Sequence, residues 1–210
     1  MKRIIIADDH AVVRHGLKRV CLDLSKDTLI SEVENGNELR RKLHTDKYDL
    51  VLLDMNMPGR DGLEILKEVK HNYPKLPVLI FSMNPEKHFA IRAIKAGASG
   101  YLNKENNDDE IRKAIELVLS GEKYLSPRTT ELLLSNFDDD PKRPLYDKLK
   151  DREFHILRLI ASGHTTAQIA QELYISPNTV TSYRRNILAK LGKKNNAELT
   201  MYAIENDLIE

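Results

Sequence analysis

Three aspartates stand directly after short apolar segments of the sequence. Asp8 and Asp9 follow residues 4–7, and Asp54 follows residues 50–53. In an open α/β sheet the carboxyl ends of the strands share one edge, where ligands bind, so we expect the three carboxylates to lie close together. Crowded carboxylates repel one another unless a cation neutralises them. Because Mg²⁺ prefers oxygen ligands and keeps water and phosphate oxygens in its shell, the sequence predicts a Mg²⁺ site here.

Two further polar residues follow other apolar segments. Ser82 comes after residues 78–81, and Lys104 comes shortly after residues 101–102. A hydroxyl and an ammonium group beside a metal-bound carboxylate form a receptacle for a phosphoryl group: Asp54 attacks, and Ser82 and Lys104 bind the equatorial oxygens. Taken singly, each residue has an ordinary explanation as a turn residue, a helix cap or a solvated charge. Their shared position at one sheet edge favours phosphoryl chemistry.

The elements that would position these residues follow from an alternation of apolar and amphipathic segments. Strands are expected at residues 4–7, 29–33, 50–53, 78–81 and 101–102. Helices are expected at residues 12–24, 37–44, 63–71, 87–96 and 108–120. Continuously apolar strands are typical of a parallel sheet that is buried on both faces. Residues 1–122 are therefore predicted to form a doubly wound α/β domain with a five-stranded parallel sheet and right-handed crossovers.

The pattern changes twice after residue 122. Residues 123–147 are predicted to be a linker, because residues 138–144 are acidic, then basic, and include two prolines. The apolar residues at 132–134 can end a short helix before it. Residues 148–210 show only helical patterns, which predicts a second, all-α domain. This region holds nine Lys and Arg residues against seven Asp and Glu residues, and residues 176–194 contain no acidic residue.

A basic helix is predicted after Ser176, which can cap it, with Pro177 in its first turn. Another helix precedes it across a tight turn, so the pair predicts a helix-turn-helix whose second helix enters the major groove of DNA. Contacts with bases or phosphates are expected from Asn178, Thr179, Thr181, Ser182, Arg184 and Arg185. Phosphate contacts are expected from Lys190, Lys193 and Lys194. The alternative is a solvated face on a four-helix bundle.

About residues 2–122 resemble the receiver domain of bacterial two-component response regulators. The resemblance rests on Asp8-Asp9, Asp54, Met57-Pro58-Gly59, Asp61-Gly62, Ser82 and residues 97–104. It implies a flavodoxin-like fold in which Asp54 accepts a phosphoryl group and Lys104 pairs with it. It also implies that Asp9, Asp54 and the backbone carbonyl of Asn56 hold Mg²⁺, with Asp8 helping, often through water. Ser82 would move toward the phosphoryl oxygens and Tyr101 would swing inward, although its position also suits an ordinary core aromatic residue.

About residues 148–205 resemble the LuxR-type module of NarL/FixJ-type regulators. The resemblance rests on Leu149, Arg152-Glu153, residues 159–161, Ile169-Ala170, Leu173, Ile175-Ser176, Thr179-Val180, Asn186-Ile187 and Lys190-Leu191-Gly192. The family often has Thr in place of Lys150, so the usual helix cap must be replaced, for which Asp151 is the candidate. It often has Lys in place of Ala167 and Thr181, so two expected phosphate contacts are in question.

Together the resemblances imply a transcription regulator that phosphorylation controls. Charge added at Asp54 would shift the surface around residues 87–96 and Tyr101 toward a partner or dimer contact. The implied partners are a sensor histidine kinase, double-stranded DNA and, after phosphorylation, a second copy of the chain. With one cysteine and no apolar stretch near the ~20 residues of a membrane span, the chain is expected in the cytoplasm without a membrane partner.

Two other hypotheses remain at this point. A phosphatase or hydrolase would need a substrate pocket and a general acid beside the nucleophile, and the sequence indicates neither, so we expect no enzyme. The other hypothesis is a receiver that acts through protein contacts, with a degenerate DNA-binding domain. The residues at positions 167 and 181 keep that hypothesis open.

Overall fold

The chain divides into two compact units, which are described separately. The computed structural model describes residues 1–25, 27–57, 61–83, 85–135 and 144–209. The N-terminal unit is Met1–Asp138 and the C-terminal unit is Asp139–Glu210. Pro58 and Gly59 of the receiver-like motif, and residues 136–143 of the expected linker, lie outside the described residues.

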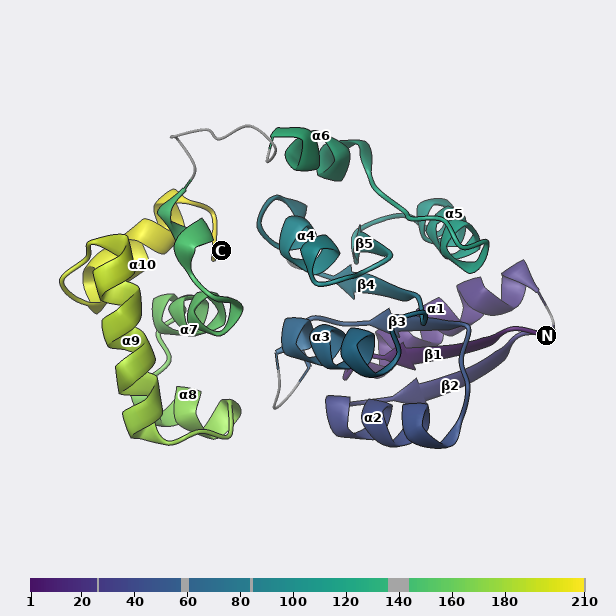
Figure 1. Cartoon of the computed structure of the whole chain (residues 1–210), viewed down its shortest axis with the longest axis horizontal. Coiled ribbons are helices and arrows are strands. Elements are labelled where there is room, and N and C mark those ends of the chain that lie inside the picture. Colours follow the sequence, from purple (N-terminus) through teal and green to yellow (C-terminus); the bar gives the residue numbers. More distant parts are fainter. Residues whose placement is uncertain (26, 58–60, 84, 136–143, 210) are drawn as a thin grey trace. The chain divides into compact units, whose positions relative to one another are not determined.

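Among the described residues of the N-terminal unit, five parallel strands form one sheet (Figure 1). The strands are β1 (Arg3–Ala7), β2 (Leu29–Val33), β3 (Leu50–Leu53), β4 (Val78–Ser82) and β5 (Gly100–Asn103). Their order is β2-β1-β3-β4-β5, so the strand order reverses between β1 and β3 and a crevice is expected at their carboxyl ends. Ala7 pairs with Leu53, and the N–H of Asp54 donates to the carbonyl of Ala7 at 2.8 Å. This register brings the residues that follow the two strands side by side.

Helices cover both faces of the sheet (Figure 1). They are α1 (Ala11–Leu24), α2 (Gly36–Thr45), α3 (Gly62–Asn72), α4 (Glu86–Lys95) and α5 (Asp108–Leu119). Helices α1 and α5 pack together, and α2, α3 and α4 contact one another in turn. The side chains of Asn35, Asp61 and Asn107 each accept a hydrogen bond from a first-turn N–H and so cap α2, α3 and α5. The predicted doubly wound fold is confirmed, and the ends of these helices and strands lie within one residue of expectation.

The strands are buried on both faces, as their apolar sequences predict. Ile4, Ile6 and Leu52 belong to a core cluster with residues of α1 and α5, and the alternate residue Ile5 is 0% exposed toward the other face. Cys21 lies in the same cluster, as expected for a core residue. Burial raises the pKa of its thiol to about 12, which makes it a packing residue and not a reactive thiol.

Residues 123–147, expected to be a linker, begin with ordered structure. Tyr124 forms a parallel bridge with Gly100 of β5, and its N–H donates to the carbonyl of Ser99 at 2.9 Å. A Cβ at position 100 would lie 2.7 Å from the carbonyl oxygen of Tyr124, so this close approach requires glycine. Helix α6 (Pro127–Ser135) follows and packs against α4. Residues 124–135 are thus ordered parts of the N-terminal unit. The sequence indicated a short helix around residues 132–134, but not its packing, since its main contacts are with residues distant in the chain.

The described residues of the C-terminal unit are mainly helical. A 3₁₀ turn, η1 (Leu145–Lys148), precedes α7 (Asp151–Ala161), α8 (Thr166–Glu172), α9 (Pro177–Leu191) and α10 (Asn196–Glu205). Helix α7 packs against α9 and α10, and α8 packs against α9. Their common core includes Phe154, Leu157, Ile169, Val180, Ile187 and Leu199. In the described parts of both units, no helix is long and apolar enough to cross a membrane.

Candidate functional site

The carboxylates of Asp8, Asp9 and Asp54 converge at the carboxyl ends of β1 and β3. One ligand atom from each, together with a ring nitrogen of His10, lies within 4.8 Å of all the others. The side chains of Asp8 and Asp54 are 1% exposed. Carboxylates so close and so deeply buried are costly unless cations neutralise them. The structure thus brings together the three aspartates that the sequence singled out, and their oxygen atoms fit a hard divalent cation.

Lys104 already lies among these carboxylates. Its Nζ is 2.6 Å from Oδ2 of Asp8 and 3.0 Å from Oδ2 of Asp54. Its backbone N–H donates to the carbonyl of Ser82 at 2.9 Å, which holds the loop after β5 against the end of β4. Burial would lower the pKa of Lys104, but the hydrogen bond with Asp8 and the charge of Asp54 outweigh burial and raise it. Lys104 therefore stays an ammonium group.

The environment of Asp54 disfavours its negative charge. Burial raises the pKa of this carboxyl; Lys104 and a backbone hydrogen bond from Asn56 oppose the rise, and the charge of Asp8 adds to it. The ammonium group of Lys104 thus does not offset the combined effect of burial and the charge of Asp8 on the pKa of Asp54. A divalent cation would supply the missing positive charge and keep Asp54 in the ionised form that a nucleophile requires.

The other predicted site residues lie on the neighbouring strands. Ser82 is the last residue of β4, is 0% exposed and pairs with Asn103, which precedes Lys104. Tyr101 of β5 is also 0% exposed, a position that suits either a switch residue in its inward state or a core aromatic. The side chain of Asn56 is exposed, and the role of its carbonyl as a metal ligand stays a prediction.

Two further side chains at the start of α1 take part: His10, which the sequence places directly after the aspartates in a supporting position, and Arg14, whose role the sequence did not show. Nδ1 of His10 lies 2.8 Å from Oδ1 of Asp9, and the backbone N–H of His10 donates to Oδ1 of Asp8 at 2.8 Å. Arg14 donates to the carbonyl oxygen of Asp8 at 2.8 Å and to Glu34 at 2.6 Å. Arg14 shares the buried face of α1 with Leu17 and so fixes the chain at Asp8. The only feature of the sequence that points to Arg14 is a cation on the apolar face of the predicted helix, five residues after Asp9.

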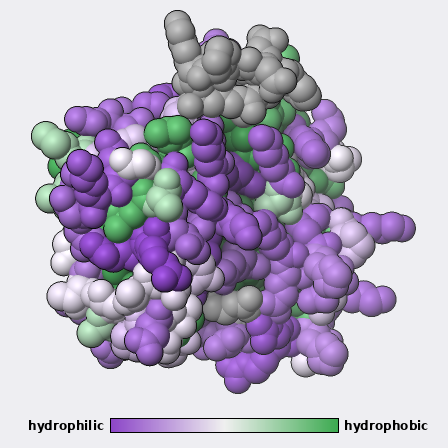
Figure 2. Space-filling view, turned by 60° about the vertical axis from the view of Figure 1, so that its left-hand side comes forward, coloured by the Kyte–Doolittle hydropathy of each residue, from purple (hydrophilic) through white to green (hydrophobic). Residues whose placement is uncertain are grey.

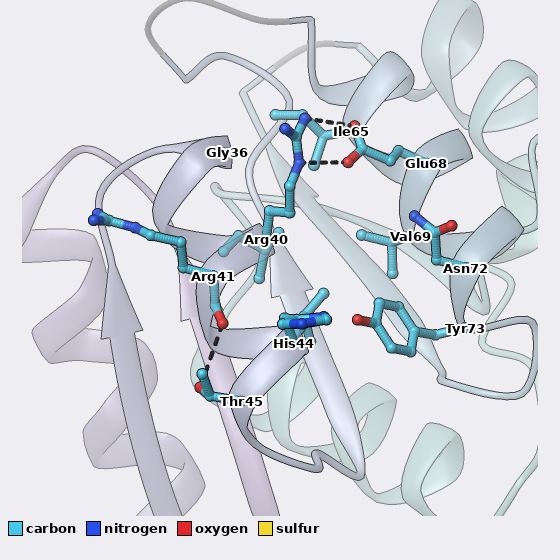
Figure 3. Close-up of a pocket in the computed structure, with 12 residues that line it drawn as sticks. Gly36, Arg40, Arg41, His44, Thr45, Ile65, Glu68, Val69, Asn72 and Tyr73 are labelled. Atoms are coloured by element: carbon cyan, nitrogen blue, oxygen red, sulfur yellow. Dashed lines mark hydrogen bonds and ion pairs between the residues drawn. The ribbon is translucent and has the colours of Figure 1, made fainter.

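A separate groove of about 640 Å³ opens between α2 and α3 (Figure 3). Ile65 and Val69 line it, His44 and Tyr73 face one another at one end, and the groove shares no residue with the acidic cluster. Arg40, near the other end, forms an ion pair with Glu68 at 2.6 Å. The groove therefore does not serve the clustered carboxylates as a substrate pocket, as the hydrolase hypothesis would require.

Helices α8 and α9 form the predicted helix-turn-helix. The turn includes Tyr174, which adopts a left-handed conformation with φ of 51°. Ser176 accepts a hydrogen bond from the N–H of Thr179 at 3.1 Å, and Pro177 occupies the first turn of α9, as predicted. The first half of α9 exposes Asn178, Thr179, Thr181 and Ser182, and Arg185 is exposed just beyond it. Hydrophilic side chains also dominate the face drawn in Figure 2, where apolar side chains form only small patches.

Several predicted DNA contacts already have partners within the unit. Nζ of Lys190 donates to Oε2 of Glu153 at 2.6 Å, and Nζ of Lys193 lies 5.2 Å from the ring centre of Tyr202. Arg184 donates to the side chain of Asn196. Arg185 and Lys194 are exposed and are the cations best placed to meet a nucleic acid.

Glu153 joins α7 to α9 and replaces the missing cap of α7. Its Oε2 accepts from the backbone N–H of Lys150 at 2.8 Å and from Lys190, and Glu153 is 3% exposed. Asp151, the candidate cap, instead stands at the first helical position, one residue after the N-cap Lys150.

Replacing Glu153 with Ala should destabilise the C-terminal unit by about 2 kcal/mol, because it removes the acceptor of a partly buried N–H and of a partly buried ammonium group. Differential scanning calorimetry of the full chain should show the transition of this unit move down while that of the N-terminal unit stays. The exposed acid Glu172, changed to Ala, is the control. Equal melting of wild type and Glu153→Ala would contradict the assigned role.

Comparison with known proteins gives the same two parts in the same order. Residues 4–116 match the family described as response regulator receiver domain, and residues 147–203 match bacterial regulatory proteins, luxR family. Response regulator GacA of Pseudomonas viridiflava is 32% identical over 211 residues, which cover 100% of this chain and 99% of GacA. Oxygen regulatory protein NreC of Staphylococcus aureus (strain JH9) is 32% identical over 215 residues, covering 99% of each chain. A solved structure of RcsB from Salmonella enterica serovar Typhimurium also matches; in it RcsB is bound to promoter rprA in the presence of phosphomimetic BeF₃⁻. The match has a TM-score of 0.69 and 26% identity, and it covers 96% of this chain and 98% of RcsB.

Proposed function

The chain belongs to the response regulators that join a receiver domain to a LuxR-type DNA-binding domain, and we propose that it accepts a phosphoryl group on Asp54 and thereby changes its binding to promoter DNA. In this proposal residues 1–122 form the receiver and residues 148–210 form the DNA-binding domain. The donor is a sensor histidine kinase, and the site of action is the cytoplasm, where donor phosphate and chromosomal DNA are both accessible.

The observation that carries the proposal is the position of Lys104 between two buried carboxylates. A carboxylate oxygen of Asp54 attacks phosphorus, the bond from phosphorus to the donor nitrogen breaks, and the electron pair leaves with the donor. The ammonium group of Lys104, 3.0 Å from Asp54, is placed to bind an oxygen of the incoming group, and the buried hydroxyl of Ser82 can donate to another. The decisive experiment is genomic footprinting of wild type and Asp54→Ala, with and without a small phosphodonor.

The metal of this site is Mg²⁺ in our proposal. Asp9, Asp54 and the carbonyl of Asn56 would hold it, with Asp8 assisting, and its charge would offset the charge that develops on the transferred group. The support is the donor set: carboxylate oxygens within 4.8 Å of one another and a net excess of negative charge. His10 next to Asp9 is placed to orient that carboxylate.

Mg²⁺ should raise the melting temperature of the N-terminal unit by several degrees, because a ligand at a hundred times its Kd stabilises the folded state by about 2.7 kcal/mol. Asp9→Asn should remove most of this rise, since it deletes a ligand without touching Lys104. The exposed acid Asp109, changed to Asn, is the control with the same loss of charge. A rise of equal size in the Asp9 variant would place the cation elsewhere.

DNA is the second partner in the proposal. The exposed polar residues of the first half of α9, with Arg185 and Lys194, would contact bases and phosphates in the major groove. RcsB, which matches the chain over 96% of its length, is a promoter-bound protein, and this supports the same role here. If no genomic fragment is bound even after phosphorylation, the receiver acts through protein contacts and its DNA-binding domain is degenerate.

Phosphorylation would also favour a homodimer, for which α10 offers an apolar stripe. Ala197, Met201 and Ile204 recur at helical spacing and are exposed, Met201 by 65% and Ile204 by 57%. On DNA with two half-sites, Met201→Glu should weaken binding about tenfold or more and leave binding to one half-site unchanged, because only the pairing is lost. Gel shifts on the two DNAs measure this, with Leu22→Glu on α1 as control. Equal losses on both DNAs would exclude α10 as the interface.

A further inference from the structure

The start of α6 is tied to the first residue of α4 by partly buried hydrogen bonds. Oγ of Ser126 donates to Oε2 of Glu86 at 2.7 Å, and Oγ1 of Thr129 donates to the same oxygen at 3.3 Å. The N–H of Thr129 donates to Oγ of Ser126 at 3.0 Å, so Ser126 also caps α6. Thr129 is 0% and Ser126 8% exposed. We call Glu86, Ser126 and Thr129 the clasp.

A second set of hydrogen bonds ties the same segment to the loop that carries Lys104. The hydroxyl of Tyr124 donates to Oε1 of Glu110 at 2.8 Å, and Oε2 of Glu110 accepts from the side-chain amide of Asn106. Oδ1 of Asn106 in turn accepts from the backbone N–H of Asn103 at 2.8 Å, so Asn106 closes the loop in which Lys104 sits. Residues 124–135 are therefore bonded on one side to the Lys104 loop and on the other to α4.

Both anchors border the phosphoryl site. Lys104 bonds Asp8 and Asp54 directly, and Glu86 begins α4 four residues after Ser82 at the end of β4. Apolar packing would hold α6 on α4 in many similar positions, whereas hydrogen bonds fix one position. Breaking them is costly, because the hydroxyls of Ser126 and Thr129 are on buried residues and would lose their acceptor. A contact of this kind is therefore either fully formed or fully broken, which is what a conformational switch requires.

We propose that residues 124–135 act as a strap that the clasp holds on α4 while Asp54 is unphosphorylated, and that phosphorylation opens the clasp. The proposal rests on the function proposed above. In the structure Lys104 binds Asp8 as well as Asp54; pairing with a phosphoryl group draws it from Asp8 and moves its loop, and Asn106, Glu110 and Tyr124 pass this movement to the strap. Glu86 and Tyr124 are positioning residues in this scheme.

Release of the strap changes how far the segment before the DNA-binding domain can reach. About ten residues freed from α4 can span up to roughly 30 Å when extended. Half-sites one helical turn apart on DNA are separated by about 34 Å. The freed length is therefore of the size that two DNA-binding domains of a dimer need to reach both half-sites at once.

Two threonines on α6 allow a matched test in the full chain. Thr129→Val removes a hydroxyl of the clasp, and Thr130→Val removes one that bonds only the carbonyl of Ser126 within its own helix. If the clasp opposes the phosphorylated state, coupling is reciprocal, and Thr129→Val should bind BeF₃⁻ with Mg²⁺ at least about fivefold more tightly than wild type. Thr130→Val should match wild type. A purely structural role for Thr129 would lower the melting temperature and leave BeF₃⁻ affinity unchanged.

Hydrogen exchange of the backbone amides of α6 provides the second measurement. In wild type, acetyl phosphate with Mg²⁺ should speed exchange in α6 about tenfold, and Thr129→Val should show the fast rate without phosphodonor. Mass spectrometry of the same samples reports phosphorylation of Asp54. Phosphorylated protein whose α6 exchanges as slowly as before would overturn the strap and leave the proposed function intact. Absence of phosphate on Asp54 would overturn both.

Discussion

Asp54→Asn should lose at least a hundredfold of the phosphate that wild type takes up from acetyl phosphate in the presence of Mg²⁺. An amide lacks the ionised oxygen that attacks phosphorus, whereas its size and burial match those of the carboxyl it replaces. Retention of label on the protein, measured with radioactive donor after acid quenching, checks the prediction. The same variant should show one affinity for promoter DNA with and without donor, because the charge that biases the receiver is never added.

A matched control distinguishes the loss of the nucleophile at position 54 from the loss of one negative charge on the protein. Asp109→Asn removes an exposed carboxylate at the start of α5 and should be labelled like wild type. Lys104→Met is informative in a different way, since it removes the cation that bonds Asp8 and Asp54 and should slow labelling without abolishing the nucleophile. Full labelling of Asp54→Asn would place the acceptor on another residue and refute the assignment.

Arg185→Ala should weaken specific DNA binding by about 1–3 kcal/mol, or roughly 5- to 150-fold. Arg185 is exposed on α9, whereas Lys190 already binds Glu153 and Arg184 already binds Asn196. If Arg185 meets a guanine edge, the variant should also discriminate less between the target and a mutated target; if it meets a phosphate, the slope of log affinity against log salt should fall by about one. Gel shifts at several salt concentrations distinguish the two.

Lys113→Ala serves as the charge-matched control for Arg185. Lys113 is exposed on α5 of the receiver, so its loss changes net charge equally without altering α9. Wild-type affinity in Arg185→Ala would indicate that α9 does not face DNA. That result would favour a regulator that acts through protein contacts.

The sequence was sufficient for features that depend on local pattern and simple topology. Apolar segments ending in Asp8, Asp54 and Ser82 predict parallel strands, and parallel strands bring their carboxyl ends together regardless of the loops between them. The cap at Ser176 could also be predicted, because it is a local contact that residues 176–179 are sufficient to form.

Contacts between distant residues could not be predicted in this way. A phosphate contact by Lys190 stays a prediction, but its ion pair with Glu153, 37 residues away, had no signal in the sequence. Asp151 was the candidate cap of α7, yet Glu153 accepts the N–H of Lys150. The ordered segment after α5 depends on the approach of Tyr124 to Gly100, and glycine in a strand does not reveal which backbone it admits.

The bridge between Tyr124 and Gly100 determines where an isolated receiver fragment should end. A chain ended at residue 122 would leave the outer backbone groups at Ser99 and Gly100, where β5 begins, without this cover, and an uncovered strand edge readily pairs with another molecule. We expect such a fragment to self-associate more readily through its sheet, as an artefact of truncation. A fragment ended at residue 135 keeps its own edge protection and is the one whose solution behaviour reflects the intact regulator.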